Sequence, residues 1–446
     1  MTTDTDIDQG RLRADLEALV ALPSVAFPGF PTEPVRAAAD LTEELLREAG
    51  LEDVVQIDVP GAAPAVFGQV APPAGSDAPT VLLYAHYDVQ PAGPEDAWTT
   101  PAFTATERDG RLYGRGTADD KCGIALHVAA LRALGDLRAA GLGIKVLVEG
   151  EEETGEGTLS TLVAADPDRF RADAFVIADG SNVATGTPTL TTSLRGFAVV
   201  EVTVSTLRDF VHSGVAGGAA PDALVALSRI IATLHDEDGD VAVAGLDRLP
   251  WDGDALDEEQ FRREAGVLDG VALVGSGPLA ERLLTRPSVT AVGIDAPTVR
   301  GAGNALIPSA RAKLSMRLAP TQDPRAAADA LVAHVRAVAP WGVQLAFEIS
   351  ALAPGALLGG EGPVATAAAA ALEAGYAAPV SRIGTGGAIP LCADLAAIYP
   401  DAEFVLWGAG DDRSRIHAAD ESVDLGDLGR AAAAELALLR SLGTAG

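Results

Sequence analysis

Residues 80–93, TVLLYAHYDVQPAG, decide the fold. The apolar run 81–84 is typical of a buried strand in a parallel sheet. It leads into His86 and Asp88, which are two residues apart and therefore project from the same face of an extended chain. Because parallel sheets bind ligands at the carboxyl ends of their strands, this ending predicts a functional edge.

The pair His86 and Asp88 has two interpretations. An aspartate that accepts the free ring N–H of a histidine fixes its tautomer, which is the arrangement around a metal-binding histidine. Taken alone, the H-x-D pattern is more often a surface or turn sequence. The rest of the chain favours the metal interpretation.

Two other apolar runs also end in acidic residues. KVLVEGEEE ends in a cluster of glutamates, and FVIAD ends at Asp179. Mutual repulsion makes the cluster costly unless solvent or a cation neutralises it. The glutamates of this cluster are Glu149, Glu151, Glu152 and Glu153.

Further ionisable residues belong to turns. Asp119 and Asp120 precede a predicted helix, where one of them could simply be an N-cap. His417 follows a glycine-rich turn. Together with the strand ends, these residues form a set of two imidazoles and at least three carboxylates, which suits two divalent ions sharing one carboxylate, with a spare glutamate as general base.

Composition excludes several classes of protein. The chain has 446 residues and a formal charge of −31, so a polyanion such as nucleic acid would be repelled. No apolar run is long enough to span a bilayer, and the acidic amino terminus lacks the features of a signal peptide, so we expect a cytoplasmic protein without membrane contact. Cys122 and Cys392 are too few for a disulfide framework.

The pattern along the chain predicts an α/β fold interrupted by an insertion. Alternating helices and short apolar strands over residues 1–192 predict a mixed, mainly parallel sheet with helices on both faces. Residues 193–353 change to strict alternation of apolar and polar residues, which predicts an antiparallel α+β domain. Residues 354–446 return to the first pattern and are expected to complete the first sheet.

At this point the chain resembles a known family. YAHYDVQPAGPEDAWTTPAFTATERDGRLYGRGTADDK, EGEEETGEG, IADGSN, HSGVAGG, LSMRLAPTQDP, GGAIP and IHAADE are similar, in the same order, to the di-metal peptidases that include carnosine dipeptidases, aminoacylases, carboxypeptidase G2 and succinyl-diaminopimelate desuccinylase. The resemblance implies a catalytic domain interrupted by a smaller lid through which the chain forms a homodimer. It also implies two divalent ions, zinc foremost, with manganese or cobalt as alternatives.

The resemblance assigns the metal ligands residue by residue. It implies that His86 and Asp179 hold one ion and that Glu153 and His417 hold the other. Asp119 would bridge the two ions. Three carboxylates against two divalent ions then leave the centre close to neutral once a hydroxide is bound.

The resemblance also assigns the catalytic and substrate-binding roles. Glu152 would take the proton of the attacking water, and Asp88 would orient His86. His212 would reach the neighbouring subunit's active site to stabilise the oxyanion, and Arg317 would bind the substrate carboxylate. Other residues implied for that carboxylate pocket are Asn304, Gly386 and Gly387.

Two positions depart from the family pattern, and three functions remain open. Cys122 replaces a small residue and is expected to be a buried packing residue. Ala388 stands where dipeptidases have serine, which affects substrate preference.

The first interpretation is a dipeptidase acting on short peptides. The alternatives are an N-acyl-amino-acid deacylase and a non-catalytic dimeric binding protein.

Overall fold

The computed structural model describes residues 6–59, 61–155, 157–358, 362–386 and 390–444. The chain divides into two compact units. The first unit comprises Met1–Thr192, Leu358–Ile383 and Leu391–Gly446, and the second comprises Ser193–Leu357 and Gly384–Pro390. The sequence pattern places the end of the insertion at residue 353 and assigns 384–390 to the catalytic domain, whereas the structure groups 384–390 with the inserted residues.

A mixed sheet forms the centre of the first unit. Its strands are β1 (Glu52–Ile57), β2 (Ala65–Val70), β3 (Thr80–His86), β6 (Gly143–Glu149), β7 (Ala174–Ile177), β17 (Glu403–Leu406), β8 (Thr189–Leu194) and β16 (Ser381–Thr385). The order is β1-β2-β6-β3-β7-β17-β8, and β16 pairs with β8. The central strands β6, β3, β7 and β17 are parallel to one another, so their carboxyl ends share one edge. The predicted mixed α/β fold is therefore confirmed.

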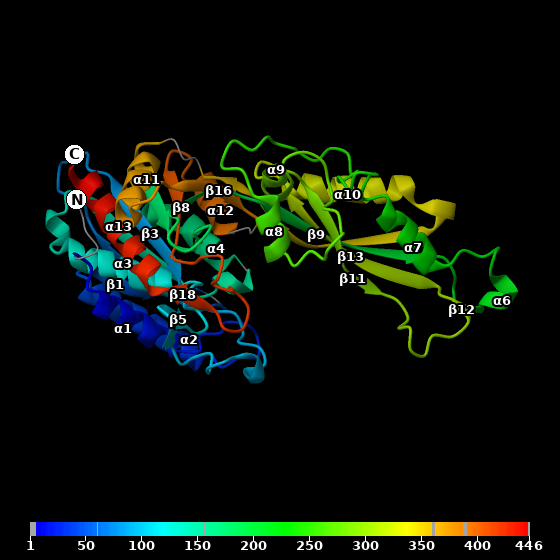
Figure 1. The fold of residues 1–446 in the computed structure, drawn as a ribbon, viewed down its shortest axis with the longest axis horizontal. Helices are drawn as coiled ribbons and strands as arrows, with labels where there is room; N and C mark the ends of the chain where they lie inside the picture. The colour runs from blue at the N-terminus through cyan, green and yellow to red at the C-terminus, as the bar shows by residue number, and fades with distance from the viewer. Residues whose placement is uncertain (1–5, 60, 156, 359–361, 387–389, 445–446) are drawn as a thin grey trace. The chain divides into compact units, whose positions relative to one another are not determined.

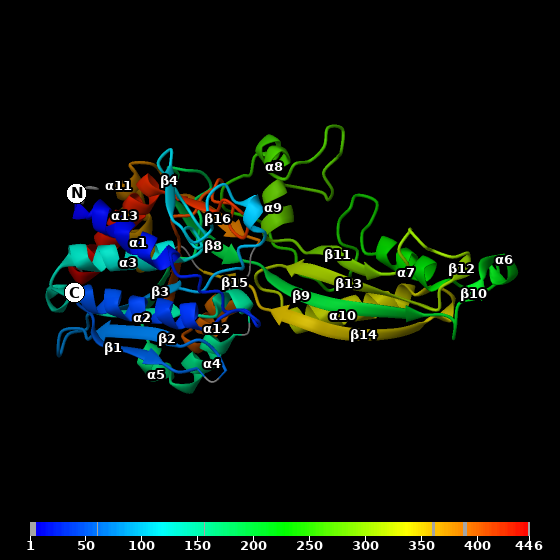
Figure 2. The same ribbon diagram turned by 90° about the horizontal axis from the view of Figure 1, so that it is seen from below.

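Helices cover both faces of this sheet (Figures 1 and 2). The helices of the first unit are α1 (Gln9–Val20), α2 (Glu33–Glu48), α3 (Lys121–Leu134), α4 (Thr158–Ala165), α5 (Pro167–Phe170), α11 (Pro363–Tyr376), α12 (Pro390–Ile398) and α13 (Leu425–Thr444). Alternation along β3 sends Val81, Leu83 and Ala85 into one apolar cluster with α2, α3, α11 and α13. On the other face, Phe175 of β7 stacks on Tyr399, which follows α12.

Smaller elements complete the first unit. The three-stranded sheet β18-β5-β4 consists of β4 (Thr106–Arg108), β5 (Arg111–Tyr113) and β18 (Ser422–Asp424). Short 3-10 helices are η2 (Glu95–Ala97), η3 (Leu137–Ala139) and η4 (Glu152–Thr154). Among the described residues, no helix combines the length and the apolarity that crossing a bilayer requires.

The second unit is built on an antiparallel sheet, as the alternating sequence predicts. Its strands β11 (Ser288–Asp295), β13 (Ser309–Leu318), β9 (Gly196–Ser205) and β14 (Gln344–Ala353) pair in that order. Helices α7 (Ala223–Ala232) and α10 (Pro324–Val338) pack on one face against Val200, Val202 and Leu314. The remaining elements are β10 (Val211–His212), β12 (Ala305–Leu306), β15 (Ala356–Leu357), α6 (Ser213–Ala216), α8 (Glu258–Glu264), α9 (Leu279–Leu284) and η5 (Pro340–Gly342).

Two glycines allow the segments after β7 and β17 to touch. A Cβ atom on Gly408 would lie 2.0 Å from the carbonyl oxygen of Gly180, and one on Gly180 would lie 2.7 Å from the carbonyl carbon of Trp407. Both distances are far below van der Waals contact. Because Gly180 directly follows Asp179, this close approach determines where the Asp179 backbone leaves the sheet.

We expect Gly408→Ala to lower the free energy of unfolding by about 1–3 kcal/mol, the usual cost of overpacking a dense interior. A denaturant titration would measure the loss. Gly293→Ala is the matched control, because its Cβ would meet only the Lys313 Cβ, at 3.9 Å. Equal stability of the two variants would contradict the close-approach argument.

Candidate metal centre

Five ionisable side chains gather at the carboxyl edge of the parallel strands. His86 is the last residue of β3, and Asp179 lies two residues beyond β7. Glu153 belongs to η4, just after β6. Asp119 precedes α3, and His417 lies in the loop before β18. Segments far apart in sequence therefore meet because their strands end at the same edge.

Asp119 lies at the middle of this cluster. Its Oδ1 is 3.1 Å from His86 Nε2, and its Oδ2 is 2.9 Å from His417 Nε2. His417 Nε2 is also 3.2 Å from Glu153 Oε2. Two groups of potential ligands follow, with Asp179 joining Asp119 and His86 in the first and with Asp119, Glu153 and His417 in the second.

The donor atoms of these groups fit divalent ions. Within each group they lie within 4.8 Å of one another, which permits an ion to contact all three. Imidazole nitrogen and carboxylate oxygen are the donors that zinc and similar transition ions accept. Asp119 is common to both groups and presents one oxygen toward each histidine, so the cluster could hold a pair of ions.

The charge of the cluster shifts several pKa values. Burial by itself would raise the pKa of Asp119, but hydrogen bonds with His417 and His86 lower it well below its usual range. Hydrogen bonds to Asp119 and Glu153 raise the pKa of His417 to about 10. Because a ligating imidazole must be neutral, binding of a metal here must displace protons.

Glu152 lies beside the ligands and is held in an unusual state for a carboxyl group. Burial, reinforced by the negative charges of Asp119 and Asp88, raises its pKa to about 7 and outweighs the opposing effect of His86. A carboxyl group with a pKa near neutrality can both accept and release a proton at physiological pH.

Asp88 holds the glutamate turn in place. Its Oδ1 accepts the backbone N–H of Glu152 at 3.1 Å, and its Oδ2 accepts that of Glu153 at 3.1 Å. His86 Nδ1 lies 3.0 Å from the Asp88 carbonyl oxygen and 3.4 Å from its Oδ1. Asp88 thus orients His86 partly through its backbone, and its carboxylate mainly positions η4.

Glu421 is a site residue to which the sequence analysis assigns no role. Its buried carboxylate accepts the backbone N–H groups of Gly116, Ala118 and Asp119 at 2.9–3.2 Å and also binds Arg115. Glu421 lies four residues after His417 in the same loop. Its side chain therefore ties the loop that carries His417 to the loop that carries Asp119. The only sequence signal is its presence in the motif IHAADE.

Gln90 is a second residue that the sequence analysis does not single out. Its Nε2 donates to Glu153 Oε2 at 2.7 Å, and its backbone N–H donates to Glu153 Oε1 at 3.1 Å. These bonds restrict the orientation of the Glu153 carboxylate.

Cys122 is fully buried in an apolar cluster, as a packing residue would be.

The remaining predicted site residues belong to the second unit. His212 is exposed in β10, where its Nδ1 accepts the N–H of Gly214 at 3.0 Å. Asn304 lies next to it, because the Asn304 carbonyl oxygen accepts the N–H of Ser213 at 2.9 Å. Arg317 lies near the end of β13, with its guanidinium 5.4 Å from the centre of the Phe197 ring.

The second unit does not bring all of these residues together. β13 begins at Ser309, shortly after Asn304, and Arg317 is the second-last residue of the strand. At about 3.3 Å per residue, Ser309 and Arg317 are roughly 26 Å apart. Gly386 is described and has no neighbour within 4 Å of a Cβ placed on it. Gly387 and Ala388 lie outside the described residues.

Comparison with known proteins gives consistent matches. The model of peptidase family M20/M25/M40 matches residues 82–441. A cysteinylglycine-S-conjugate dipeptidase of Corynebacterium striatum is 41% identical over 411 residues, which cover 91% of this chain and 90% of the relative. A beta-Ala-His dipeptidase of Rattus norvegicus is 30% identical over 58% of this chain and 56% of its own length.

Solved structures show the same fold. Human carnosine dipeptidase 1 superposes with a TM-score of 0.79 at 23% identity, covering 98% of this chain and 96% of its own. A metallo-carboxypeptidase of Sulfolobus solfataricus gives a TM-score of 0.82 at 23% identity, covering 97% and 99%. At this level of identity, the structural matches establish the fold alone.

We expect Glu421→Gln to fold but to bind divalent ions about 10–100-fold more weakly, the usual effect of losing a group that orients metal ligands. Competition with a chromophoric chelator would measure this affinity directly. Glu107→Gln is the control, since Glu107 is an exposed partner of Arg13 and an exposed ion pair contributes little. Unchanged metal affinity in a folded Glu421→Gln protein would refute the role of Glu421.

Proposed function

The chain belongs to peptidase family M20/M25/M40, and from that premise we propose that it is a dipeptidase that hydrolyses the amide bond with water activated at a two-metal centre. The observation that carries this proposal is the sharing of Asp119 between two groups of ligands. Glu152, which belongs to neither group, lies beside them and is available as a base.

In this proposal the side chains that could bind metal have divided roles. His86 and Asp179 would hold one ion, Glu153 and His417 would hold the other, and Asp119, which belongs to both groups, would be shared. When bound there, divalent ions would supply polarisation of the scissile carbonyl and a lowered pKa of water. Zinc suits the donor set best, and manganese and cobalt accept the same donors.

Glu152 moves the proton in this mechanism. Its carboxylate takes a proton from the attacking water and delivers it to the nitrogen of the departing amine, so one residue serves both halves of the hydrolysis. Asp88 supports this step, because its two hydrogen bonds hold the backbone of η4 and therefore the direction of the Glu152 side chain.

The carboxylate of the substrate is assigned to the second unit. Arg317 provides the fixed positive charge, and a guanidinium pairs with a carboxylate through two parallel hydrogen bonds. Further donors proposed for the same carboxylate are Asn304, Gly386 and Gly387.

His212 is proposed to act on the active site of a partner subunit in a homodimer. Within one second unit, His212 lies beside Asn304, which precedes the Ser309 end of β13, whereas Arg317 lies near the other end of that strand, roughly 26 Å from Ser309. That separation supports a model in which the two residues serve different active sites. In this model, Asn304 and His212 of one subunit both serve the active site of the partner. A substrate carboxylate bound by Arg317 of one chain is then also contacted by Asn304 of the other chain.

The substrate class follows from the relatives. The Corynebacterium striatum relative is named for peptides of cysteinylglycine in which the cysteine sulfur carries a substituent. We propose the same class here: a dipeptide with glycine at the carboxyl end and a cysteine, plain or S-substituted, at the amino end. A panel of dipeptides tested beside the matching N-acetyl amino acids checks this, because a deacylase would prefer the latter.

We expect Glu152→Gln to retain two equivalents of metal and to lose about three orders of magnitude or more in turnover, since the amide cannot accept the proton. Metal analysis and peptide hydrolysis on the same preparation would test both parts. Glu95→Gln, an exposed acid of η2, is the control. Loss of metal together with activity would make Glu152 a ligand instead.

We also expect two inactive variants to restore each other. In a mixed dimer of His212→Ala and Glu152→Gln chains, one active site receives Glu152 from the first chain and His212 from the second. Co-expression with two affinity tags isolates that dimer for assay. Recovery should approach half of the native activity, and absence of recovery in a confirmed mixed dimer would exclude action across subunits.

A further inference from the structure

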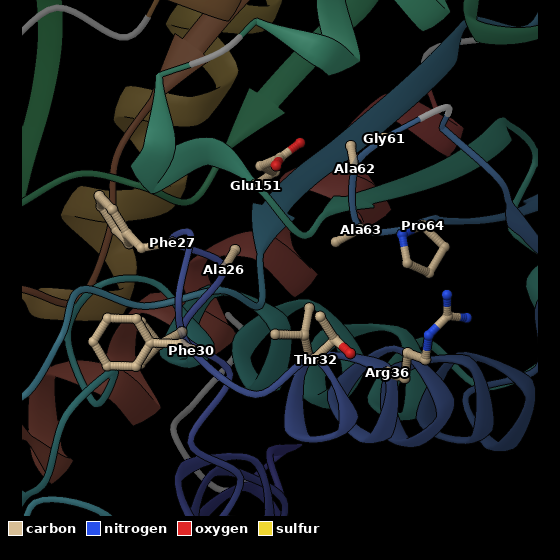
Figure 3. Close-up of a pocket in the computed structure, with 12 residues that line it drawn as sticks. Ala26, Phe27, Phe30, Thr32, Arg36, Gly61, Ala62, Ala63, Pro64 and Glu151 are labelled. Atoms are coloured by element: carbon tan, nitrogen blue, oxygen red, sulfur yellow. The ribbon is translucent and has the colours of Figure 1, made fainter.

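The first unit contains a pocket of about 150 Å³ near the metal centre. Its walls come from the loop between α1 and α2, the start of α2, the loop between β1 and β2, and Glu151 after β6. Figure 3 shows Phe27 and Phe30 on one side and Ala63 and Pro64 on the other. The pocket therefore has an apolar pair of walls.

Hydrogen bonds join this pocket to the strand end that carries Asp88. The Ser24 hydroxyl donates to the carbonyl oxygen of Tyr87 at 2.6 Å, and the Ser24 carbonyl accepts the N–H of Val89 at 3.1 Å. The Tyr87 hydroxyl donates to the carbonyl oxygen of Pro64 at 2.6 Å. Both loops of the pocket are thus held by the residues on either side of Asp88.

The pocket suits part of a ligand and not a whole one. A cavity of about 150 Å³ between the apolar side chains of Phe27, Phe30, Ala63 and Pro64 has room for one aromatic ring, whereas a complete organic ligand needs at least about 300 Å³. Phe30 is 44% exposed, so its ring offers apolar surface to a bound ligand. Arg36 and Glu151 are the charged residues of the lining.

We propose that this pocket binds an apolar, ring-sized substituent on the amino-terminal side chain of the dipeptide. The inference rests on the proposed function. In the sheet, His86 of β3 lies opposite Glu149 of β6, and Val148 of β6 lies opposite Val66 of β2. The pocket loop that ends at Pro64 therefore lies one strand away from the strand end that carries His86, on the side of the turn with Glu151 and Glu152. The carboxyl-terminal residue is assigned to Arg317, which leaves the amino-terminal residue for groups of the first unit.

Filling the pocket tests the proposal. In Ala62→Trp the indole would occupy the space between the loops, so kcat/KM for S-benzyl-cysteinylglycine should fall at least tenfold while that for alanylglycine stays within twofold. Phe30→Ala should lower kcat/KM for the S-benzyl peptide about fivefold through loss of one aromatic contact. Ala74→Trp, in an exposed loop between β2 and β3, is the matched control and should change neither.

The outcomes separate this inference from the proposed function. A wild-type enzyme that cleaves neither peptide overturns the dipeptidase proposal itself. A wild-type enzyme that cleaves both, with Ala62→Trp and Phe30→Ala affecting the two peptides equally or not at all, overturns the pocket assignment alone. Should Ala62→Trp fail to fold by circular dichroism, the Phe30→Ala comparison decides the matter, because this substitution removes a largely exposed ring.

Discussion

Repulsion among the carboxylates at one edge of the sheet is the constraint on which the rest of the first unit depends. Asp88, Asp119, Glu152, Glu153 and Asp179 follow strands or loops that converge there. Buried like charges cannot all stay ionised unless other groups compensate them. Burial is the first cause of the raised pKa values of Glu152 and Asp179, and the negative charge of neighbouring carboxylates raises both further.

Backbone amides provide much of the compensation within the chain. Asp88 receives two N–H groups from η4, and Glu421 receives three from the loop before α3. Several hydrogen bonds tie each carboxylate to a separate loop, and Arg115 also pairs with Glu421, so these two acids act as structural anchors. The Asp119 carboxylate instead contacts two imidazoles. It can therefore exchange these contacts for bound metal ions, which the amide-bound carboxylates cannot do.

Residues next to strong periodic signals could be predicted from the sequence. His86 and Asp179 follow apolar runs that can hardly be anything but buried strands, so their meeting at one edge follows from the parallel sheet. Spacing alone does not choose between Asp119 and Asp120. In the structure, Asp119 presents its oxygens to both histidines, whereas the Asp120 carboxylate accepts the His86 backbone N–H and the Cys122 thiol. Glu421 and the loops of the pocket depend on contacts between segments without any periodic pattern, and such contacts leave no local trace in sequence.

The contact between Gly180 and Gly408 constrains how this chain can change over time. At most buried positions, a larger side chain can be accommodated when a neighbouring side chain becomes smaller. Here the obstacle on each side is backbone, with the Gly180 carbonyl facing Gly408 and the Trp407 carbonyl facing Gly180. No second substitution nearby can remove it. A larger residue at either position therefore cannot be compensated by a second substitution during evolution. The backbone path of the segment that begins at Asp179 is fixed by two glycines that take no part in the chemistry themselves.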